Sequence, residues 1–328
     1  MNKSCLIGFL MCSAFSLVVQ AATDGAHITK TISQIERKKG IKRTIQYRPD
    51  GNDFVCVNGK NRYTRALYGG ITDFRIETSD RPVFATYKPK DSKHICFRLQ
   101  CGNQSIALDS LKFCEARYRA GRRTYRLTDP LLGKGELNIS VLAFPDAEGG
   151  IWRFTMKDMP EGALLHCYIS EIRAKNLSRN GDMGADRADS FDAPQLPKEQ
   201  KHYKLSLDGT TAYIVVEDQE LRLPALVEGT SLYDKSEKWR SEIESSLQIS
   251  TPDPYFNPLG GALAAAADGI WDGKIWLHGA IGWRSQLNGW RAAYIGDFIG
   301  WHDRARTHFD SYAASQVTDV PATIPHPT

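Results

Sequence analysis

The sequence predicts a mainly β protein, in which a large antiparallel β-sandwich is followed by a linker helix and a short helical region. Between about residues 40 and 234, short segments alternate apolar and polar residues and are separated by Gly, Pro, Asp and Asn, as in half-buried strands. From residue 235 onward, apolar residues recur every three or four positions, as in amphipathic helices. We therefore expect a β-sandwich domain at 22–234, a linker helix at 235–250 and a helical region at 251–328.

The β region contains ten or so candidate strands. The clearest alternating segments are 53–57, 71–78, 83–88, 94–99, 137–144, 151–158 and 164–172. In 203–218, two alternating runs flank Asp208-Gly209, a dipeptide typical of two-residue turns, which predicts a hairpin. Residues 178–200 hold few apolar residues and many turn formers, and they are expected to form a surface loop.

The basic run 117-RYRAGRR-123 is interpreted as a second hairpin with exposed arginines. The alternative is a nucleic-acid-binding patch, but the net charge of the whole chain is only +4. We therefore expect no nucleic-acid partner.

The first 21 residues have the organisation of a secretory signal peptide. Lys3 supplies a positive charge, an apolar run extends from Cys5 to Val19, and Val19-Gln20-Ala21 forms a small-x-small cleavage site. The run is too short to cross a membrane, and no other segment reaches 18 apolar residues. The expected protein is secreted or periplasmic, is cleaved after Ala21 and has no membrane span; a buried N-terminal helix is the alternative.

The cysteines after Ala21 do not form a disulfide scaffold. They are odd in number and thinly spread: Cys56, Cys96, Cys101, Cys114 and Cys167. This leaves room for one or two bridges, with Cys96 and Cys101 as candidates. Neither a CxxC pair nor a His/Cys cluster has zinc-site spacing, so no metal and no cofactor are expected.

The helical region carries wide apolar faces. Trp239, Ile243 and Leu247 form one stripe of the linker helix, and Asn257-Pro258 begins the next, with Asn257 as its cap. The small residues of 259–271 allow another helix to approach closely. The last helix is expected from Trp290 to Gln316, with an aromatic stripe on one face: Tyr294, Phe298, Trp301, Ala305, Phe309 and Tyr312. Such a stripe needs a partner, either the sandwich or further helices.

Five of the seven tryptophans fall between Trp271 and Trp301, among arginines and histidines. Sugar rings stack on tryptophan, and their hydroxyls hydrogen-bond to Arg, His and Asp. The candidate substrate-binding residues are His278, Trp283, Arg284, Trp290 and Arg291. The alternatives are helix-packing core for the tryptophans, structural ion pairs for the arginines and a helix cap for His278.

Two carboxylates in the same stretch are candidates for catalysis, because glycoside hydrolysis uses a pair of carboxyl groups. Asp297 lies at the border of the aromatic stripe, and pairing with Arg304 is its alternative role. Asp303 lies on the opposite face, where a solvated ion pair with Arg306 is the alternative.

The segments 253-DPYFNPLGGALAAAADGIWD-272 and 276-WLHGAIGWRSQLNGWRAAYIGDFIGWHDRARTHFDSYAASQ-316 resemble the large six-hairpin glycosidases of gut-type Bacteroidetes. The nearest resemblance is to an uncharacterised family of large Bacteroides proteins close to glycoside hydrolase family 142. It implies an N-terminal β-sandwich and a catalytic (α/α)6 toroid whose first helices lie at 251–328. It also implies an exo-acting glycoside hydrolase that acts on an oligo- or polysaccharide, such as the side chains of a complex polysaccharide.

A toroid of twelve helices needs several hundred residues, so only its first hairpin fits into 251–328. We therefore expect the N-terminal part of a longer enzyme, inactive alone, whose acid and base residues lie in the missing C-terminal part. The alternatives are a non-catalytic secreted module that binds a glycan or a protein, and a product without independent activity. No Ser-His-Asp order, phosphate loop or dinucleotide fingerprint indicates another enzyme class.

The signal-peptide prediction can be tested directly. N-terminal sequencing of protein recovered from the periplasm or the medium should begin at Ala22, because Val19-Gln20-Ala21 is the cleavage site. A cytoplasmic product that retains Met1 would contradict it.

Overall fold

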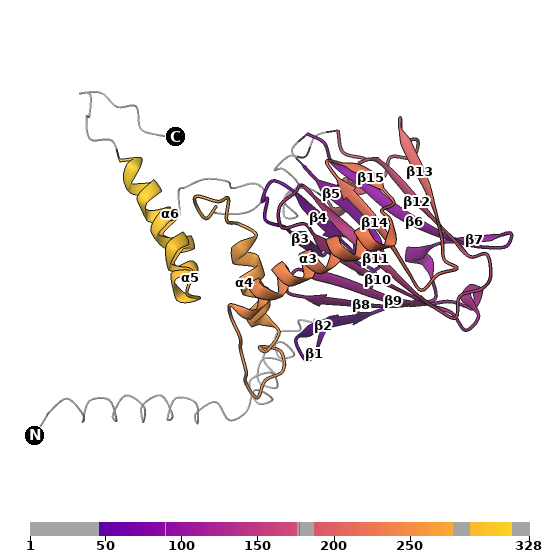
Figure 1. Cartoon of the computed structure of the whole chain (residues 1–328), viewed down its shortest axis with the longest axis horizontal. Helices are drawn as coiled ribbons and strands as arrows, with labels where there is room; N and C mark the ends of the chain where they lie inside the picture. Colours follow the sequence, from indigo (N-terminus) through magenta and orange to yellow (C-terminus); the bar gives the residue numbers. More distant parts are fainter. Residues whose placement is uncertain (1–45, 89, 176, 178–186, 278–288, 317–328) are drawn as a thin grey trace, which may run out of the picture.

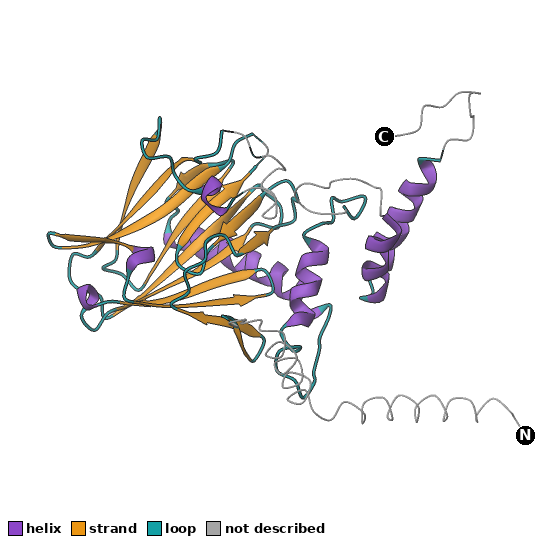
Figure 2. Ribbon diagram, turned by 180° about the vertical axis from the view of Figure 1, so that it is seen from behind, coloured by secondary structure: helices purple, strands orange, loops and turns teal. Residues whose placement is uncertain are grey.

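The computed structural model describes residues 46–88, 90–175, 177, 187–277 and 289–316. It confirms the mainly β class, since two antiparallel sheets face each other as a sandwich (Figures 1 and 2). The α-helices of this part of the chain follow the last strand in sequence.

Every strand pairing within the two sheets is antiparallel. The eight-stranded sheet has, in spatial order, β1 (Arg48–Asp50), β2 (Asp53–Val57), β8 (Phe113–Arg119), β9 (Arg122–Thr128), β10 (Glu136–Ala143), β11 (Gly149–Lys157), β14 (Thr211–Glu217) and β15 (Glu220–Arg222). The seven-stranded sheet has β13 (Gln200–Ser206), β12 (Leu164–Glu171), β6 (Lys93–Cys101), β5 (Val83–Tyr87), β4 (Arg75–Thr78) and β3 (Arg65–Tyr68), with β7 (Gln104–Ala107) also paired to β6. Three short 3-10 helices lie between strands, at Leu108–Ser110, Pro130–Leu132 and Ala188–Phe191.

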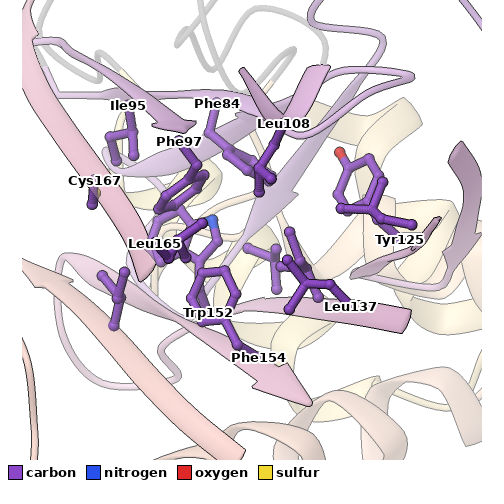
Figure 3. Packing of buried hydrophobic residues seen from close by; sticks show 14 of the residues in the cluster. Phe84, Ile95, Phe97, Leu108, Tyr125, Leu137, Trp152, Phe154, Leu165 and Cys167 are labelled. Carbon is purple, nitrogen blue, oxygen red and sulfur yellow. The ribbon is translucent and has the colours of Figure 1, made fainter. Parts of the chain in front are cut away.

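The main core fills the space between the two sheets (Figure 3). Phe84 of β5 makes edge-on contacts with Phe97, Tyr125 and Trp152, so rings from both sheets interlock. Most strands contribute the apolar half of their alternation to this core, which is why the period of two predicted the sandwich.

The predicted hairpin at 203–218 is wrong. β13 pairs with β12 in one sheet, whereas β14 pairs with β11 in the other. Neither Asp208 nor Gly209 has the positive φ that a two-residue type I′ turn requires. Leu207, just before the turn, is fully buried in the core, so the chain crosses between the sheets instead of folding back.

The predicted hairpin at 117–123 is confirmed, but its arginines are not all exposed. β8 and β9 are joined at Ala120 and Gly121, which both have positive φ, 27° and 88°. Arg123 points into the sandwich, where its side chain is 0% exposed and donates to Tyr47 and to the Ser79 carbonyl.

The predicted linker helix at 235–250 occupies Leu226–Ser245 in the structure (α3), and it begins soon after the last strand. It packs on the outer face of the eight-stranded sheet over β10, β11 and β14. Its buried residues are Gly229, Tyr233, Ser236 and Arg240, and not the predicted apolar stripe. The stripe is partly buried because Trp239 and Ile243 face α4 (Leu259–Asp268) across a small cavity.

Two further helix predictions are corrected. Asn257 does not cap α4, because its side-chain oxygen accepts from the backbone N–H of Thr251. The last helix is not continuous: α5 (Gly289–Phe298) ends before Gly300, whose φ is 88°, and α6 (His302–Ala314) starts after Trp301. The expected close approach to the small residues of α4 is confirmed, since Gly260 and Ala264 are buried and α4 packs against α3.

All five cysteines of the described part are free thiols, so the candidate bridge between Cys96 and Cys101 does not form. Both residues lie on the same strand, β6. Burial raises the pKa of the Cys96 thiol to about 11 and that of Cys114 to about 12, which keeps these thiols protonated and unreactive. Among the described residues, no helix has both the length and the apolar character needed to span a membrane.

Charged hydrogen bonds hold the C-terminal half of α3 to the sheet. Arg240 is 5% exposed and donates to the Ala120 carbonyl (3.2 Å) and to Glu244 (2.7 Å). Arg119 of β8 donates to the other Glu244 oxygen at 2.7 Å. Burial by itself raises the pKa of Glu244, but these hydrogen bonds outweigh it and lower the pKa below its ordinary value.

We predict that Glu244→Gln lowers the free energy of unfolding by about 1.5–3 kcal/mol at pH 7, because charge-assisted hydrogen bonds are lost. The stabilisation by Glu244 is complete above its ordinary pKa of 4.5 and disappears as the pH falls through the lower folded-state pKa. Urea unfolding should therefore show a smaller difference from wild type in acid. The exposed Glu242→Gln is the control, and an equal loss at both pH values would contradict the argument.

Candidate functional site

A polar groove crosses the outer face of the eight-stranded sheet beside α3. Its volume of about 320 Å³ lies at the lower end of the range for small-molecule sites. Strands β8 to β11 form its floor, and Tyr233 of α3 stands at one side. Twelve residues line it: Glu115, Arg117, Arg122, Thr124, Tyr125, Arg126, Asn138, Ile139, Ser140, Arg153, Thr155 and Tyr233.

The strand alternation places the polar side chains of the groove in rows across the sheet. Ser140 of β10 is paired with Thr124 of β9 on one side and with Arg153 of β11 on the other. Their chain neighbours, such as Trp152 and Val141, point into the core. The groove floor is therefore the polar half of the same alternation that builds the sandwich.

Tyr233 fixes the edge of the groove that α3 provides. Its hydroxyl lies 2.7 Å from the Ser140 hydroxyl, and its ring packs in a small apolar cluster with Tyr213 and Ile151. The Arg153 guanidinium stacks on the Tyr233 ring, with 3.8 Å between its central carbon and the ring centroid. This stacking holds the guanidinium plane in place without using its N–H groups.

Glu115 is held as a carboxylate by two arginines of the groove. Arg117 donates to it at 2.8 Å and Arg126 at 3.1 Å. Burial by itself raises the pKa of Glu115, but these hydrogen bonds outweigh burial and lower the pKa below its ordinary value. At neutral pH, Glu115 is therefore ionised, and both its oxygens already accept hydrogen bonds.

Arg122 connects the groove to α3. Its Nη1 donates to Glu237 at 2.8 Å, and the same carboxylate accepts from Arg240. The Nε atom of Arg122 is buried without a hydrogen-bond partner, and so is the Nε atom of Arg153. Two buried donors of the groove are therefore unused in the described structure.

The comparisons with known proteins bear on this same region. Residues 89–217 match the model of a domain of unknown function, DUF4450. A search of curated proteins found no match. The matched segment is similar to that domain from just before β6 to the end of β14, so it includes the four floor strands β8 to β11. Helix α3, which carries Tyr233, lies outside it.

Most of the sequence-predicted substrate-binding residues cannot be placed. His278, Trp283 and Arg284 lie outside the described residues. Trp290 and Arg291 belong to α5, but their side chains are also outside the description.

The two candidate catalytic carboxylates are exposed and do not line the groove. Asp297, near the end of α5, is 2.7 Å from Nδ1 of His302, and not paired with Arg304 as its alternative role required. Asp303 lies in the first turn of α6, where a negative charge favours the helix dipole.

A second cluster attaches α6 to α4. Arg304 donates to the buried Asp268 at 2.7 Å and lies over the Trp301 and Trp271 rings. The fully buried Trp276 donates its indole N–H to the Ala267 carbonyl. Three of the five clustered tryptophans, Trp271, Trp276 and Trp301, therefore pack helices together, which is the alternative role that the sequence suggested.

Metal binding finds no support in the described ranges, where no group of three or more His, Cys, Asp or Glu side chains could hold an ion. The chemistry of the groove is instead that of hydrogen bonding, with hydroxyls, one amide and four guanidinium groups.

The groove residues were missed at the sequence level. Arg117 and Arg122 had been interpreted as exposed arginines of a hairpin, and Arg126 lay outside the segments predicted as strands. Arg153 stood at a polar position of a strand that was recognised from its apolar residues. A signal existed, because these outward positions hold arginine together with Ser, Thr and Asn. Residues of this kind suit recognition of a polar ligand, whereas an ordinary solvated face carries mixed Lys and Glu.

Proposed function

We propose that this is a secreted carbohydrate-binding protein whose β-sandwich holds an oligosaccharide in the groove beside α3. The observation that carries the proposal is the lining itself. It combines hydroxyl, amide and guanidinium groups on a rigid sheet, in a groove of about 320 Å³. Sugar hydroxyls both donate and accept hydrogen bonds, so a row such as Thr124, Ser140 and Arg153 complements them.

The groove is better suited to binding than to hydrolysis. Glu115 is the one carboxylate among its twelve lining residues, and glycoside hydrolysis uses two. Glu115 also has a lowered pKa and is occupied by Arg117 and Arg126, so it is a poor proton donor at neutral pH. Export, which the N-terminal residues suggest, would expose such a module to extracellular glycans.

A second candidate function is the glycoside hydrolase implied by the family resemblance. The observation in its favour is an aromatic face on α5 and α6, where Tyr294 is 62%, Phe298 83%, Phe309 44% and Tyr312 45% exposed. Further helices of an (α/α)6 toroid would cover this face. In this candidate, Asp297 and Asp303 are the first carboxylates to test, and Trp290 and Arg291 contact the sugar.

The binding proposal predicts that filling the groove abolishes binding. An oligosaccharide that wild type binds should bind to Thr155→Tyr with an affinity about tenfold lower or weaker still, because the larger side chain occupies the groove. Isothermal titration calorimetry against a panel of neutral and acidic plant-type oligosaccharides measures this. Thr128→Tyr, on β9 but not in the lining, is the matched control. Equal binding by the two variants would exclude the groove.

The two candidate functions predict different behaviour on the same panel. If the groove only binds glycan, residues 22–328 release no sugar, because the single carboxylate of the groove lining lacks a catalytic partner. Chromatography of the products detects release. Turnover that is lost in Asp297→Asn or Asp303→Asn would instead establish the hydrolase candidate.

A further inference from the structure

We propose that the oligosaccharide bound in the groove is acidic, and that Arg153 binds its carboxylate or sulfate group. The inference rests on the proposed function, since it names the class of glycan that the same groove recognises.

The four groove arginines differ in their carboxylate partners. Three of them have carboxylate partners: Arg117 pairs with Asp50, Asp53 and Glu115, Arg122 with Glu237, and Arg126 with Glu115 and Glu136. Arg153 has neither an ion-pair nor a hydrogen-bond partner among the described residues. It is nevertheless only partly exposed, and its Nε atom is buried.

A buried and unpaired donor of this kind is costly. Leaving an N–H group without a partner away from water is unfavourable, and more so when the group is charged. Stacking on the Tyr233 ring offsets part of this and fixes the plane of the guanidinium, but it satisfies no N–H. The remaining N–H groups are therefore available to a ligand.

The charges around this end of the groove favour an anion. Three guanidinium groups, those of Arg119, Arg122 and Arg240, share the two carboxylates that α3 supplies, Glu237 and Glu244. Arg153 lines the same groove as Arg122 and adds a fourth positive charge without a carboxylate partner among the described residues. The Nε atom of Arg122 is the second buried donor without a partner. An anionic group on the ligand would balance this positive excess.

The shape of the guanidinium indicates which anion fits. Its planar fork donates two parallel hydrogen bonds to a carboxylate or to a sulfate oxygen pair. The hydroxyls of Thr124, Ser140 and Thr155 surround Arg153 on the sheet and can hydrogen-bond to ring hydroxyls of the same sugar. This combination suits a uronic acid or a sulfated sugar within a glycan.

The test compares matched ligands on the intact chain by isothermal titration calorimetry. Trigalacturonate is compared with its methyl ester, which keeps the sugar rings and removes the charge. A sulfated galacto-oligosaccharide is compared with its unsulfated form in the same way. The tighter-binding member of the two acidic probes identifies the anionic group.

Arg153→Gln should weaken binding of the acidic probe by about tenfold or more and change binding of the uncharged partner by less than about twofold. Lys157→Gln removes one positive charge from the same face of β11 outside the groove lining, and it should change neither by more than about twofold. Arg153→Lys, which keeps the charge and loses the fork, should lie between wild type and Arg153→Gln. Thermal melting checks that each variant is folded. If Arg153→Gln is not folded, the comparison of Arg153→Lys with wild type decides the test.

The outcomes separate the two proposals. If charged and uncharged probes bind equally and Arg153→Gln weakens both alike, the groove binds neutral glycans and the inference is overturned, while the proposed function stands. If Lys157→Gln lowers affinity as much as Arg153→Gln, general electrostatic attraction explains the preference and Arg153 is not the recognition residue. If none of the probes binds, the proposed function itself fails.

Discussion

The packing of α3 on the outer face of the eight-stranded sheet is the interaction on which the rest of the molecule depends. Tyr233 joins three parts of it at once, since its ring belongs to the apolar cluster under the helix, its hydroxyl meets Ser140 and its ring face holds Arg153. Because α3 covers β10, β11 and β14 incompletely, the remaining polar surface is left as a groove with a rigid floor. The far end of the same helix, through Trp239 and Ile243, faces α4.

Arginine has two distinct roles in this sandwich. Arg75 and Arg123 are both buried. Arg75, on the face of the seven-stranded sheet opposite the main core, pairs with Glu77 and stacks on Tyr87, and Arg123 meets the buried Asp80 at 3.8 Å. Such internal charges are tolerated only because each is hydrogen-bonded or paired on several sides. Arg153, on the other face of the sheet, has an aromatic ring beneath it and no carboxylate beside it among the described residues. The contrast is what marks Arg153 as a residue for a ligand.

The sequence predicted the sandwich because period-two alternation reports which side of a strand meets the core. The same pattern carries no information about which strand lies beside which, and so 203–218 was read as a hairpin although β13 and β14 belong to different sheets. On β9 the alternation places Arg123 on the buried face with Tyr125 and Leu127, and Arg122 on the groove face. This was missed because the basic run 117–123 was interpreted as uniformly exposed. The buried face of α3 was missed for a related reason. Its buried positions include Ser236, whose hydroxyl donates to the Leu232 carbonyl of the same helix, and Arg240, which donates to the Ala120 carbonyl between β8 and β9. Neither residue has an apolar signature.

Two surfaces of the described structure differ in kind. One is the exposed aromatic residues of α5 and α6, and the other is the arginines of the groove. Exposed rings such as Phe298 gain free energy from any apolar cover, so they indicate packing but not its chemistry. A guanidinium fork with a buried Nε donates hydrogen bonds only to oxygen acceptors that lie in its own plane, so it strongly restricts the chemistry of the ligand. For this reason the proposed binding function is placed in the groove of the sandwich, and a catalytic role of the helical region is the second proposal.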